Sequence, residues 1–572
     1  MTPVSLKELE LTINLPTNLH PASNIKHLTV CSLTSLAHIC LTPNRNMMLH
    51  SPSNLLTILF ITLFSWSLSG QSPDIQPDQI QFVRQGVKRL IFDQEQQITL
   101  SSLDPATNIG MPSMYPTHHY SEQQAEIQTQ NNQLTIQSSK PSETSIWVGG
   151  FNPFASYELD LEAISGSGEI GYEFTSADQS LRFIVSVTYA DGLITGVTNH
   201  IKRSSEAEST VVSTKNINQQ SLNGRLIIQM LGSGYTAYIE NNSLPIPIGQ
   251  FDFAEKIDLR QKKLINSLQS RVYLKIKQGQ VIINKAKIAL NTGLGQADIR
   301  AITYEDGSPY LDAGRLWYTM SIRGRALPHH VQGVFSMNPS VFDLRLEGVI
   351  VFDRGDGLLR NEIASHLFYD RKEQIWRGLT TGFSAYAIKE EKKQLLAIES
   401  QRDPRFGFSI MKSETFGIVG DIEDPHLLLD TKDNKWRILT CVNQGGYKAV
   451  VLESDFWNRD FKQVYGPVAH NSTGTSIQKI GNQYYCFSGS SEREIFIYTY
   501  PDLKDAGTLQ MDLPPWDENA GTRVWPNVVQ LPEGYPYPIV ALMMDRYNYP
   551  GVEGPNWTYG ALYLYHGAVS ED

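Results

Sequence analysis

Acidic side chains are concentrated in one short segment, GDIEDPHLLLD, at residues 420–430. Asp421, Glu423 and Asp424 stand directly before an apolar run that is expected to be buried. Carboxylates this close repel one another, and the repulsion can keep one of them protonated at a higher pH than usual. A protonated and an ionised carboxylate at one site can serve as general acid and general base. An isolated cluster of this kind is, however, also typical of a solvated turn that leads into a strand.

The acidic segment precedes one copy of an internal repeat. Residues 365–381, SHLFYDRKEQIWRGLTT, superimpose without a gap on residues 425–441, PHLLLDTKDNKWRILTC. The superposition places His366 on His426. A histidine that recurs at one repeat position is typical of a shared packing role, although either histidine could also contact a substrate. Looser copies, each an apolar strand, a turn and an aromatic strand, occupy residues 299–321, 475–489 and 527–545.

Five hairpins whose aromatic positions recur about every 50 to 60 residues are typical of radial repetition, in which each unit forms a four-stranded blade. We therefore predict an all-β protein with a five-bladed β-propeller at residues 296–570. The inner strand of each blade faces a central channel, so equivalent positions of different blades converge at its mouth. Asp298, Glu362 and Glu423 stand before the predicted inner strands of the first three blades, and we expect them to surround one site.

Three carboxylates around one funnel are suited to the hydrolysis of glycosidic bonds. One can protonate the leaving oxygen, one can act as base or nucleophile, and the third can adjust a pKa or bind a sugar hydroxyl. Arg523 and Trp525 precede the fifth inner strand and could supply a clamp for a hydroxyl or carboxylate and an apolar platform for a sugar ring. Asp421 is expected to bind substrate or, alternatively, to serve as the acid. Asp424 precedes a proline and is expected to initiate the turn.

The order of these residues resembles that of the five-bladed glycoside hydrolases of family 43 and of the invertase-like family 32. The resemblance rests on an Asp before the first inner strand, an acid before the second, and IEDPHLL at the third. It implies that Asp298 is the base or nucleophile, that Glu362 modulates the site and that Glu423 is the general acid. The second blade carries RNE where those enzymes have an Asp-Pro step.

Other interpretations of the same residues are open. If Asp424 and the following proline correspond to the second-blade motif of these families, Thr473 stands where the acid is needed. The propeller would then bind carbohydrate without cleaving it. A polysaccharide lyase would instead use His366 or His426 as its base, beside Arg523. Propellers host many activities, so the fold by itself does not choose among these functions.

Residues 81–290 read as short alternating apolar and polar runs separated by turn residues, a pattern typical of an antiparallel β-sandwich. We predict a jelly-roll or lectin-like sandwich that precedes the propeller and acts as a scaffold or a carbohydrate-binding module. The segment GSGEIG at residues 166–171 matches the dinucleotide-binding fingerprint in form only, because a strand follows it in place of a helix. We predict a hairpin turn there.

The N-terminal residues are expected to be absent from the mature protein. The apolar segment within residues 47–71 ends in small residues, is shorter than a typical membrane span and fits a signal peptide. Residues 1–46 precede it and are interpreted as a misassigned leader. We therefore predict a secreted or periplasmic protein. Cys441 and Cys486 would be its only cysteines, and two residues do not show whether they pair.

Composition narrows the choice of partners. A net charge of −11 disfavours nucleic acid or an anionic membrane as the main partner. Neither Cys-x-x-Cys nor His-Glu-x-x-His occurs in the sequence, so we expect no catalytic metal or cofactor. A structural calcium ion in the propeller channel would be compatible with the predicted fold. We predict a monomer that binds a carbohydrate substrate and, once the signal peptide is removed, no membrane.

Overall fold

The computed structural model describes residues 75–105, 117–206, 210–324, 330–383, 391–554 and 556–569. All described residues belong to one compact unit, Ser72–Asp572. The predicted leader and signal peptide therefore lie outside the described residues. The described part of the chain contains no helix with the length and apolar character of a membrane span.

Regular structure in the described residues is almost entirely β-strand, which confirms the predicted all-β class. The helical elements are α3 (Lys262–Ser267) and the short 3-10 helices η1 (Pro77–Gln79) and η2 (Gln94–Gln96).

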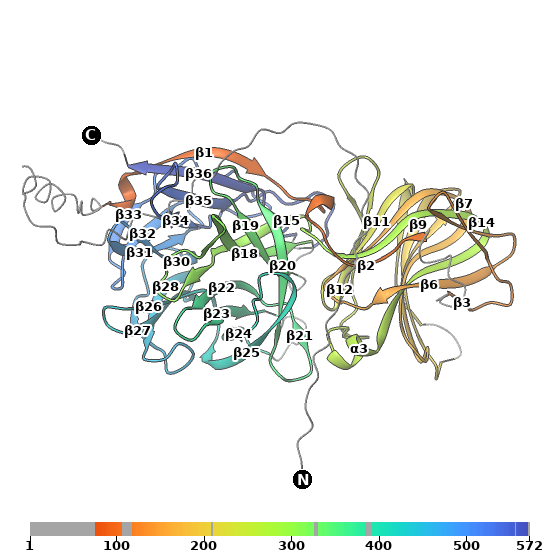
Figure 1. Ribbon diagram of the computed structural model, residues 1–572, viewed down its shortest axis with the longest axis horizontal. Helices are drawn as coiled ribbons and strands as arrows, with labels where there is room; N and C mark the ends of the chain where they lie inside the picture. Colours follow the sequence, from red (N-terminus) through yellow and green to blue (C-terminus); the bar gives the residue numbers. More distant parts are fainter. Residues whose placement is uncertain are drawn as a thin grey trace, which may run out of the picture. The chain divides into compact units, whose positions relative to one another are not determined.

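The C-terminal part of the chain forms five four-stranded antiparallel blades (Figure 1). The first blade contains β15 (Gly295–Ala301), β18 (Arg315–Arg323), β19 (Val331–Met337) and β20 (Arg345–Asp353). The second contains β22 (Ile363–Asp370), β23 (Ile375–Gly382), β24 (Gln394–Ser400) and β25 (Gly407–Val419). The third contains β26 (Ile422–Asp430), β27 (Lys435–Asn443), β28 (Tyr447–Ser454) and β29 (Lys462–Tyr465).

The fourth blade contains β30 (Thr473–Ile480), β31 (Gln483–Gly489), β32 (Ile495–Thr499) and β33 (Asp505–Thr508). The fifth contains β34 (Val528–Gln530), β35 (Ile539–Met544), β36 (Leu562–Val569) and, as its outermost strand, β1 (Ile80–Lys88). The inner strands β15, β22, β26, β30 and β34 adjoin one another in this order, and β35 returns to β15. These contacts close a ring, so the predicted five-bladed propeller is confirmed.

The first two blades are also joined at their outer edges. There β20 and β25 pair in parallel, so that one sheet extends across both blades. Three two-residue strands complete this sheet: β16 (Thr303–Tyr304) beside β22, β17 (Leu311–Asp312) beside β18, and β21 (Leu359–Arg360) beside β20.

Strand β1 comes from the start of the described chain and pairs antiparallel with β36 along its length (Figure 1). The range 81–290, predicted as the sandwich, therefore begins inside a propeller strand. Local sequence does not distinguish the two assignments, because a strand alternates with a period of two in either domain. Pairing with β36 is a contact between the two ends of the chain. It completes the fifth blade and covers the edge of β36, which would otherwise be open.

The sandwich lies in sequence between β1 and β15. Its strands are β2 (Ile98–Leu103), β3 (Thr117–His119), β4 (Glu126–Gln130), β5 (Gln133–Ser138), β6 (Ser142–Gly150), β7 (Ser156–Ser176), β8 (Leu181–Ala190), β9 (Leu193–Arg203), β10 (Thr210–Ser221), β11 (Gly224–Met230), β12 (Gly234–Glu240), β13 (Ile246–Asp252) and β14 (Leu268–Leu290).

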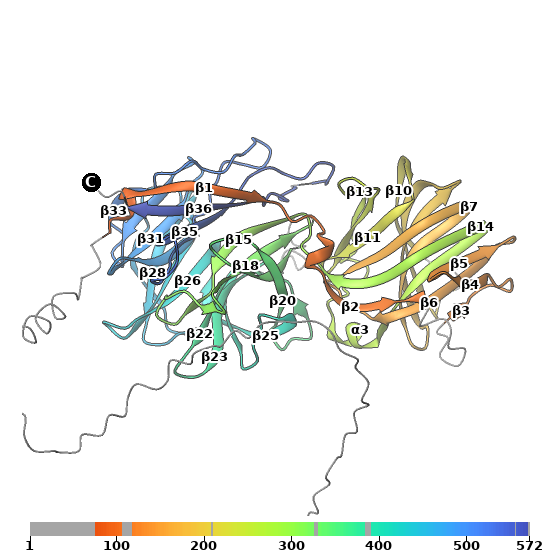
Figure 2. The same cartoon turned by 45° about the horizontal axis from the view of Figure 1, so that its top comes forward.

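Two long strands, β7 and β14, pair with each other through most of the sandwich (Figure 2). The first part of β7 also pairs with β11 and its last part with β8. The first part of β14 likewise pairs with β6, and its last part with β5 and β2. Each long strand therefore belongs to both layers, and aromatic rings such as Tyr157, Phe174 and Phe183 fill the core.

The segment GSGEIG lies inside β7 and is not the hairpin turn that its composition predicted. Gly166 has a φ of 74° and faces Gly279 of β14, whose φ is 122°. A Cβ atom on Gly166 would lie 2.0 Å from the carbonyl oxygen of Gln278, so only glycine fits at this position. Glycines are frequent both in turns and where two strands approach closely or bend. Composition alone therefore does not distinguish the two, which explains the wrong prediction.

Candidate active site

A β-bulge recurs at the start of the inner strand in each of the first four blades. In each case the ladder to the neighbouring strand skips two residues of the inner strand. The first skipped residues have positive φ angles: Asp298 (55°), Ala364 (54°), Asp424 (60°) and Gly474 (61°). A left-handed conformation costs about 1–2 kcal/mol for a residue other than glycine. The shared register makes these four residues equivalent, and two of them are carboxylates.

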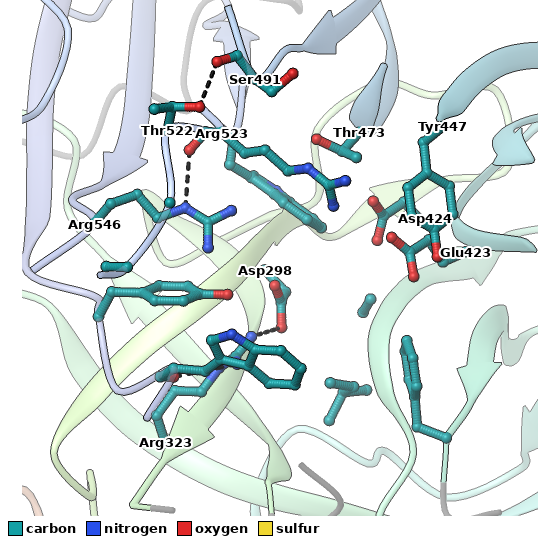
Figure 3. Close-up of a pocket in the computed structure, with 18 of the residues that line it drawn as sticks. Asp298, Arg323, Glu423, Asp424, Tyr447, Thr473, Ser491, Thr522, Arg523 and Arg546 are labelled. Atoms are coloured by element: carbon teal, nitrogen blue, oxygen red, sulfur yellow. Dashed lines mark hydrogen bonds and ion pairs between the residues drawn. The ribbon is translucent and has the colours of Figure 1, made fainter. Parts of the chain in front are cut away.

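Residues of all five blades line a cavity of about 470 Å³ that brings these bulges together (Figure 3). Asp298, Ala364 and Asp424 line it, as does the predicted acid Glu423. Its charged lining residues are Asp298, Arg323, Lys393, Glu423, Asp424, Arg523 and Arg546. Bulges redirect side chains and are frequent next to active sites. The repeated backbone feature therefore builds one polar site.

Asp298 is buried and oriented by the strand next to it. Its Oδ2 accepts hydrogen bonds from Ser321 Oγ at 2.6 Å and from the guanidinium of Arg323, both on β18. Arg323 is itself buried and also contacts His330 Nε2 at 2.9 Å and the backbone carbonyl of Trp557 at 3.4 Å. A carboxylate held in this way has the fixed geometry that a general base or nucleophile requires.

The third blade contributes two carboxylates with different surroundings. Asp424 is buried, and its Oδ2 accepts a hydrogen bond from Gly474 N–H at 2.8 Å. Burial and the neighbouring Glu423 carboxylate raise the pKa of Asp424 to about 7, although Arg300 acts in the opposite direction. Glu423 is less buried, and its Oε2 lies 3.0 Å from Lys393 Nζ. A carboxyl group with a pKa near 7 can donate a proton at neutral pH, so Asp424 is better suited than Glu423 to the role of general acid.

Asp421 does not line the cavity and instead holds a lysine that does. Its carboxylate accepts hydrogen bonds from Lys393 Nζ and from the Tyr447 hydroxyl, each at 2.6 Å. Asn443 Nδ2 donates a third, also at 2.6 Å. Burial raises the pKa of Asp421, but these donors outweigh burial and lower the pKa to about 2. Lys393 thus bridges Asp421 and Glu423.

Glu362, predicted as the second-blade catalytic carboxylate, does not line the cavity. It is fully buried, with Oε1 accepting a hydrogen bond from Arg354 at 2.7 Å and Oε2 accepting one from Phe383 N–H at 2.5 Å. Glu362 stands two residues before the bulge, in register with the buried Ile422 of the third blade. The second blade presents Ala364 to the cavity in its place.

His366 and His426 stack on each other and do not line the cavity. Their ring centroids are 3.9 Å apart, with an angle of 18° between the ring planes. His366 Nδ1 accepts a hydrogen bond from Leu427 N–H at 3.2 Å, and its Nε2 lies 3.2 Å from Thr303 Oγ1. Burial, followed by the charge of Arg300, lowers the pKa of His366 to about 3. Both histidines therefore pack within the propeller, where they cannot contact a substrate in this cavity.

A structural calcium ion in the propeller channel stays a prediction, and the surroundings of these two histidines do not favour such an ion beside them. Calcium binds six to eight oxygen ligands. The guanidinium of Arg300 is fully buried here, and its charge contributes to lowering the pKa of both His366 and His426. A calcium ion at this place would therefore meet a positive charge and two imidazole rings.

Cys441 lies close to the third-blade carboxylates. Its Sγ and the carboxylate oxygens of Glu423 and Asp424 lie within 4.8 Å of one another, a spacing that could hold a metal ion. Burial, together with the charges of Asp424 and Glu423, raises the pKa of the Cys441 thiol well above its usual range. Metal binding requires the thiolate. The surroundings of Cys441 favour the protonated thiol instead, which disfavours a metal ion here. Cys441 and Cys486 are both buried as free thiols.

Arg523 and Trp525 of the fifth blade both line the cavity. Trp525 is buried, and its Nε1 donates a hydrogen bond to the backbone carbonyl of Ile299 at 2.8 Å. A Cβ atom on Gly474 would lie 2.7 Å from the Trp525 ring, so the indole packs tightly against the fourth-blade bulge. Trp557, which is 37 % exposed, offers a more accessible aromatic face. Trp525 therefore joins neighbouring blades as well as lining the site.

Several charged residues of the cavity were missed by the sequence analysis: Arg323, Lys393 and Arg546. Arg323 ends β18, Lys393 precedes β24, and Arg546 follows β35. None of them lies at the start of an inner strand, which is where the repeat predicts site residues. The one available signal was the position of Arg546, just after the fifth apolar hairpin.

No protein-family model and no curated protein matches the chain. Among solved structures, it is similar to a thermostable family-43 glycoside hydrolase at 12% identity, over 48% of this chain and 88% of that chain, with a TM-score of 0.32. It is also similar to an endo-1,4-beta-xylanase from Bacteroides thetaiotaomicron (12% identity, 49% and 93% coverage, TM-score 0.32). A third similar structure is a B. subtilis levansucrase variant (12% identity, 49% and 86% coverage, TM-score 0.34). Identities and TM-scores this low do not establish an activity for this chain.

Proposed function

We propose that this protein is a glycoside hydrolase that uses Asp424 as general acid and Asp298 as base or nucleophile. The proposal is supported by one observation: Asp298 and Asp424 occupy equivalent bulges and face the same cavity. The groups that surround the two carboxylates differ. Asp424 is buried next to another carboxylate, whereas Asp298 accepts hydrogen bonds from Arg323 and Ser321. A carboxyl group with a raised pKa, together with a second carboxylate held in place at the same cavity, is the pattern that glycoside hydrolysis requires.

In the proposed reaction, Asp424 donates its proton to the glycosidic oxygen as the bond to the anomeric carbon breaks. Asp298 either attacks that carbon or takes a proton from an attacking water. Glu423 is a positioning residue, since its charge raises the pKa of Asp424 while Lys393 holds its carboxylate. The accessible face of Trp557 could stack against a sugar ring. The carbohydrate substrate and the secreted or periplasmic location predicted from the sequence are part of the same proposal.

Hydrolysis of glycosides with good and poor leaving groups tests the assignment. On substrates whose leaving group is a sugar, Asp424→Asn and Asp298→Asn should each lower kcat/KM by about 10²–10⁴-fold. On glycosides of an acidic phenol, Asp424→Asn should lose far less activity, because that leaving group departs without a proton. Asp298→Asn should lose activity on both kinds of substrate.

Asp455→Asn provides the control, because this exposed third-blade carboxylate pairs with Lys435 and does not line the cavity. It should behave as the unaltered protein. An Asp424→Asn variant that loses activity equally on both kinds of leaving group would contradict a general-acid role.

A second candidate is a carbohydrate-binding propeller without hydrolysis, which is favoured by Ala364 at the second-blade bulge. In that case calorimetry would detect saccharide binding by the unaltered protein and by Asp298→Asn alike, with no turnover by either. The lyase interpretation is not supported, because its candidate bases His366 and His426 do not line the cavity.

A further inference from the structure

Three arginines in the last two blades make no ion pair with any carboxylate of the described residues: Arg493, Arg523 and Arg546. Within the described residues, their side chains contact backbone carbonyls and aromatic rings. Arg405 and Arg437 differ, because each binds at least two carboxylates. The protein has a net charge of −11, so the absence of partners does not reflect a shortage of acidic residues.

Arg523 and Arg546 both line the cavity, and Figure 3 shows their guanidinium groups pointing into it. Arg546 Nε donates a hydrogen bond to the backbone carbonyl of Arg523 at 2.9 Å, which ties the two residues together. Cζ of Arg523 lies 5.2 Å from the ring centroid of Tyr447, and Cζ of Arg546 lies 4.0 Å from that of Tyr559. Stacking on a ring orients a guanidinium and leaves N–H donors at its edge for a ligand.

Arg493 adds to the positive charge behind this pair. Its guanidinium donates hydrogen bonds to the backbone carbonyl of Thr522 at 3.4 Å and to that of Pro514. Burial, followed by the charge of Arg546, lowers the pKa of Arg493. Like charges placed this close are unfavourable unless a negative group joins them.

The carboxylates of the cavity do not neutralise these arginines. Asp298 is paired with Arg323, and Glu423 with Lys393. Asp424, with a pKa of about 7, is partly protonated at neutral pH. The cavity therefore carries an excess of positive charge on its fifth-blade side.

Building on the proposed hydrolase function, we propose that the substrate is a saccharide bearing a carboxylate or sulfate group, and that Arg523 and Arg546 bind this anionic group. A guanidinium presents parallel N–H donors that match two oxygens of a carboxylate or sulfate. An anionic group would also neutralise these two charges, which no carboxylate of the described residues pairs with. Neutral hydroxyl groups could accept hydrogen bonds here, but they would leave both charges uncompensated.

Matched aryl glycosides that differ only in one group test this specificity. Each set contains the neutral sugar, its uronate and its 6-sulfate. One set is built on glucose and one on galactose. The anionic member should show a kcat/KM about ten- to a hundredfold higher than the neutral one, since hydrogen bonds to charged groups contribute about 1.5–3 kcal/mol. The uronate and sulfate arms distinguish which anion is bound.

Arg523→Gln and Arg546→Gln should reduce this preference, lowering kcat/KM on the anionic member more than on the neutral one. Arg371→Gln is the matched control, because Arg371 is about half exposed and pairs with Glu305 and Asp306 away from the cavity. It should leave the preference intact. Equal rates on neutral and anionic members, or variants that lower both equally, would overturn the inference.

Binding separates this inference from the proposed function. If no glycoside is cleaved, hydrolysis fails as a proposal, and calorimetry with uronate oligosaccharides and their neutral counterparts still tests the anion site. Binding of the uronate alone, weakened in Arg523→Gln, would support the site. Equal affinity for both oligosaccharides, or none for either, would refute it.

Discussion

The second and third blades begin with sequences that superimpose without a gap, and their inner strands carry the same bulge, with φ angles of 54° and 60°. The third-blade bulge holds Asp424, which lines the cavity, whereas the second-blade bulge holds Ala364. The acid of the second blade, Glu362, pairs with Arg354 instead. The backbone thus creates the same position in each blade, and one side chain decides whether that position can do chemistry.

The largest expected difference between the two blades is in catalysis. Glu362→Gln should leave kcat/KM per folded protein nearly unchanged, because Glu362 does not line the cavity, whereas Asp424→Asn should lower it by about 10²–10⁴-fold. Steady-state kinetics on a disaccharide, with circular dichroism to measure the folded fraction, provides the comparison. A loss in Glu362→Gln as large as that in Asp424→Asn would restore the three-carboxylate prediction.

The next effect is on stability and compares the second blade with the fourth. Gly474→Ala should lower the free energy of unfolding by about 2–4 kcal/mol, because the new Cβ would be in a left-handed backbone and 2.7 Å from Trp525. Ala364→Gly at the equivalent bulge should change it by less than about 1 kcal/mol, since relief of strain is offset by a more flexible unfolded chain. Urea unfolding followed by tryptophan fluorescence measures both. Similar changes in the two variants would contradict the tight packing of Gly474 against Trp525.

A smaller effect concerns the pH dependence of kcat/KM, which the two acids Glu423 and Asp424 of the third blade should set. Catalysis by a protonated Asp424 should fall as pH rises through its pKa of about 7. Glu423 raises that pKa, so Glu423→Gln should shift the alkaline limb of the kcat/KM profile to lower pH. The exposed control Asp455→Asn should leave the limb in place. An alkaline limb that does not move in Glu423→Gln would mean that another group carries the proton.

The smallest expected effect comes from giving the second blade the side chain of the third. Ala364→Asp should fold, because aspartate tolerates a positive φ better than most residues. Its additional negative charge at the cavity should raise the pKa of Asp424 and shift the alkaline limb to higher pH. Ala364→Asn has the same shape without the charge and should leave the limb unchanged. Equal profiles for the two variants would place Ala364 too far from Asp424 to affect its proton.

The sequence already contains a sign that Glu362 does not correspond to the third-blade acids. The gapless superposition of the second and third blades aligns Glu362 with Ile422 and Ala364 with Asp424. The prediction instead relied on the distance of an acid from the next apolar run. The repeat alignment therefore predicts the positions equivalent to these acids as well as the equivalence of the histidines.

Asp424 was predicted to initiate a turn because it precedes a proline. The structure gives it a different environment, in which it is buried, forms part of the bulge and accepts a hydrogen bond from Gly474 of the next blade. Burial and a partner from another blade are properties of the assembled ring. Neither can be recognised in a dipeptide, so the choice between Glu423 and Asp424 could not be made before the fold was known.

The sequence by itself determined the all-β class, the repeat and the convergence of Asp298 and Glu423 at one site, because these depend on periodicity and on equivalence between repeats. Only the tertiary structure decided which acids face the cavity, that β1 completes the fifth blade, and that Arg523 and Arg546 have no carboxylate partner among the described residues. A single residue with positive φ redirects the side chains around it, and contacts between distant blades set burial and charge. Such contacts arise only when the ring closes.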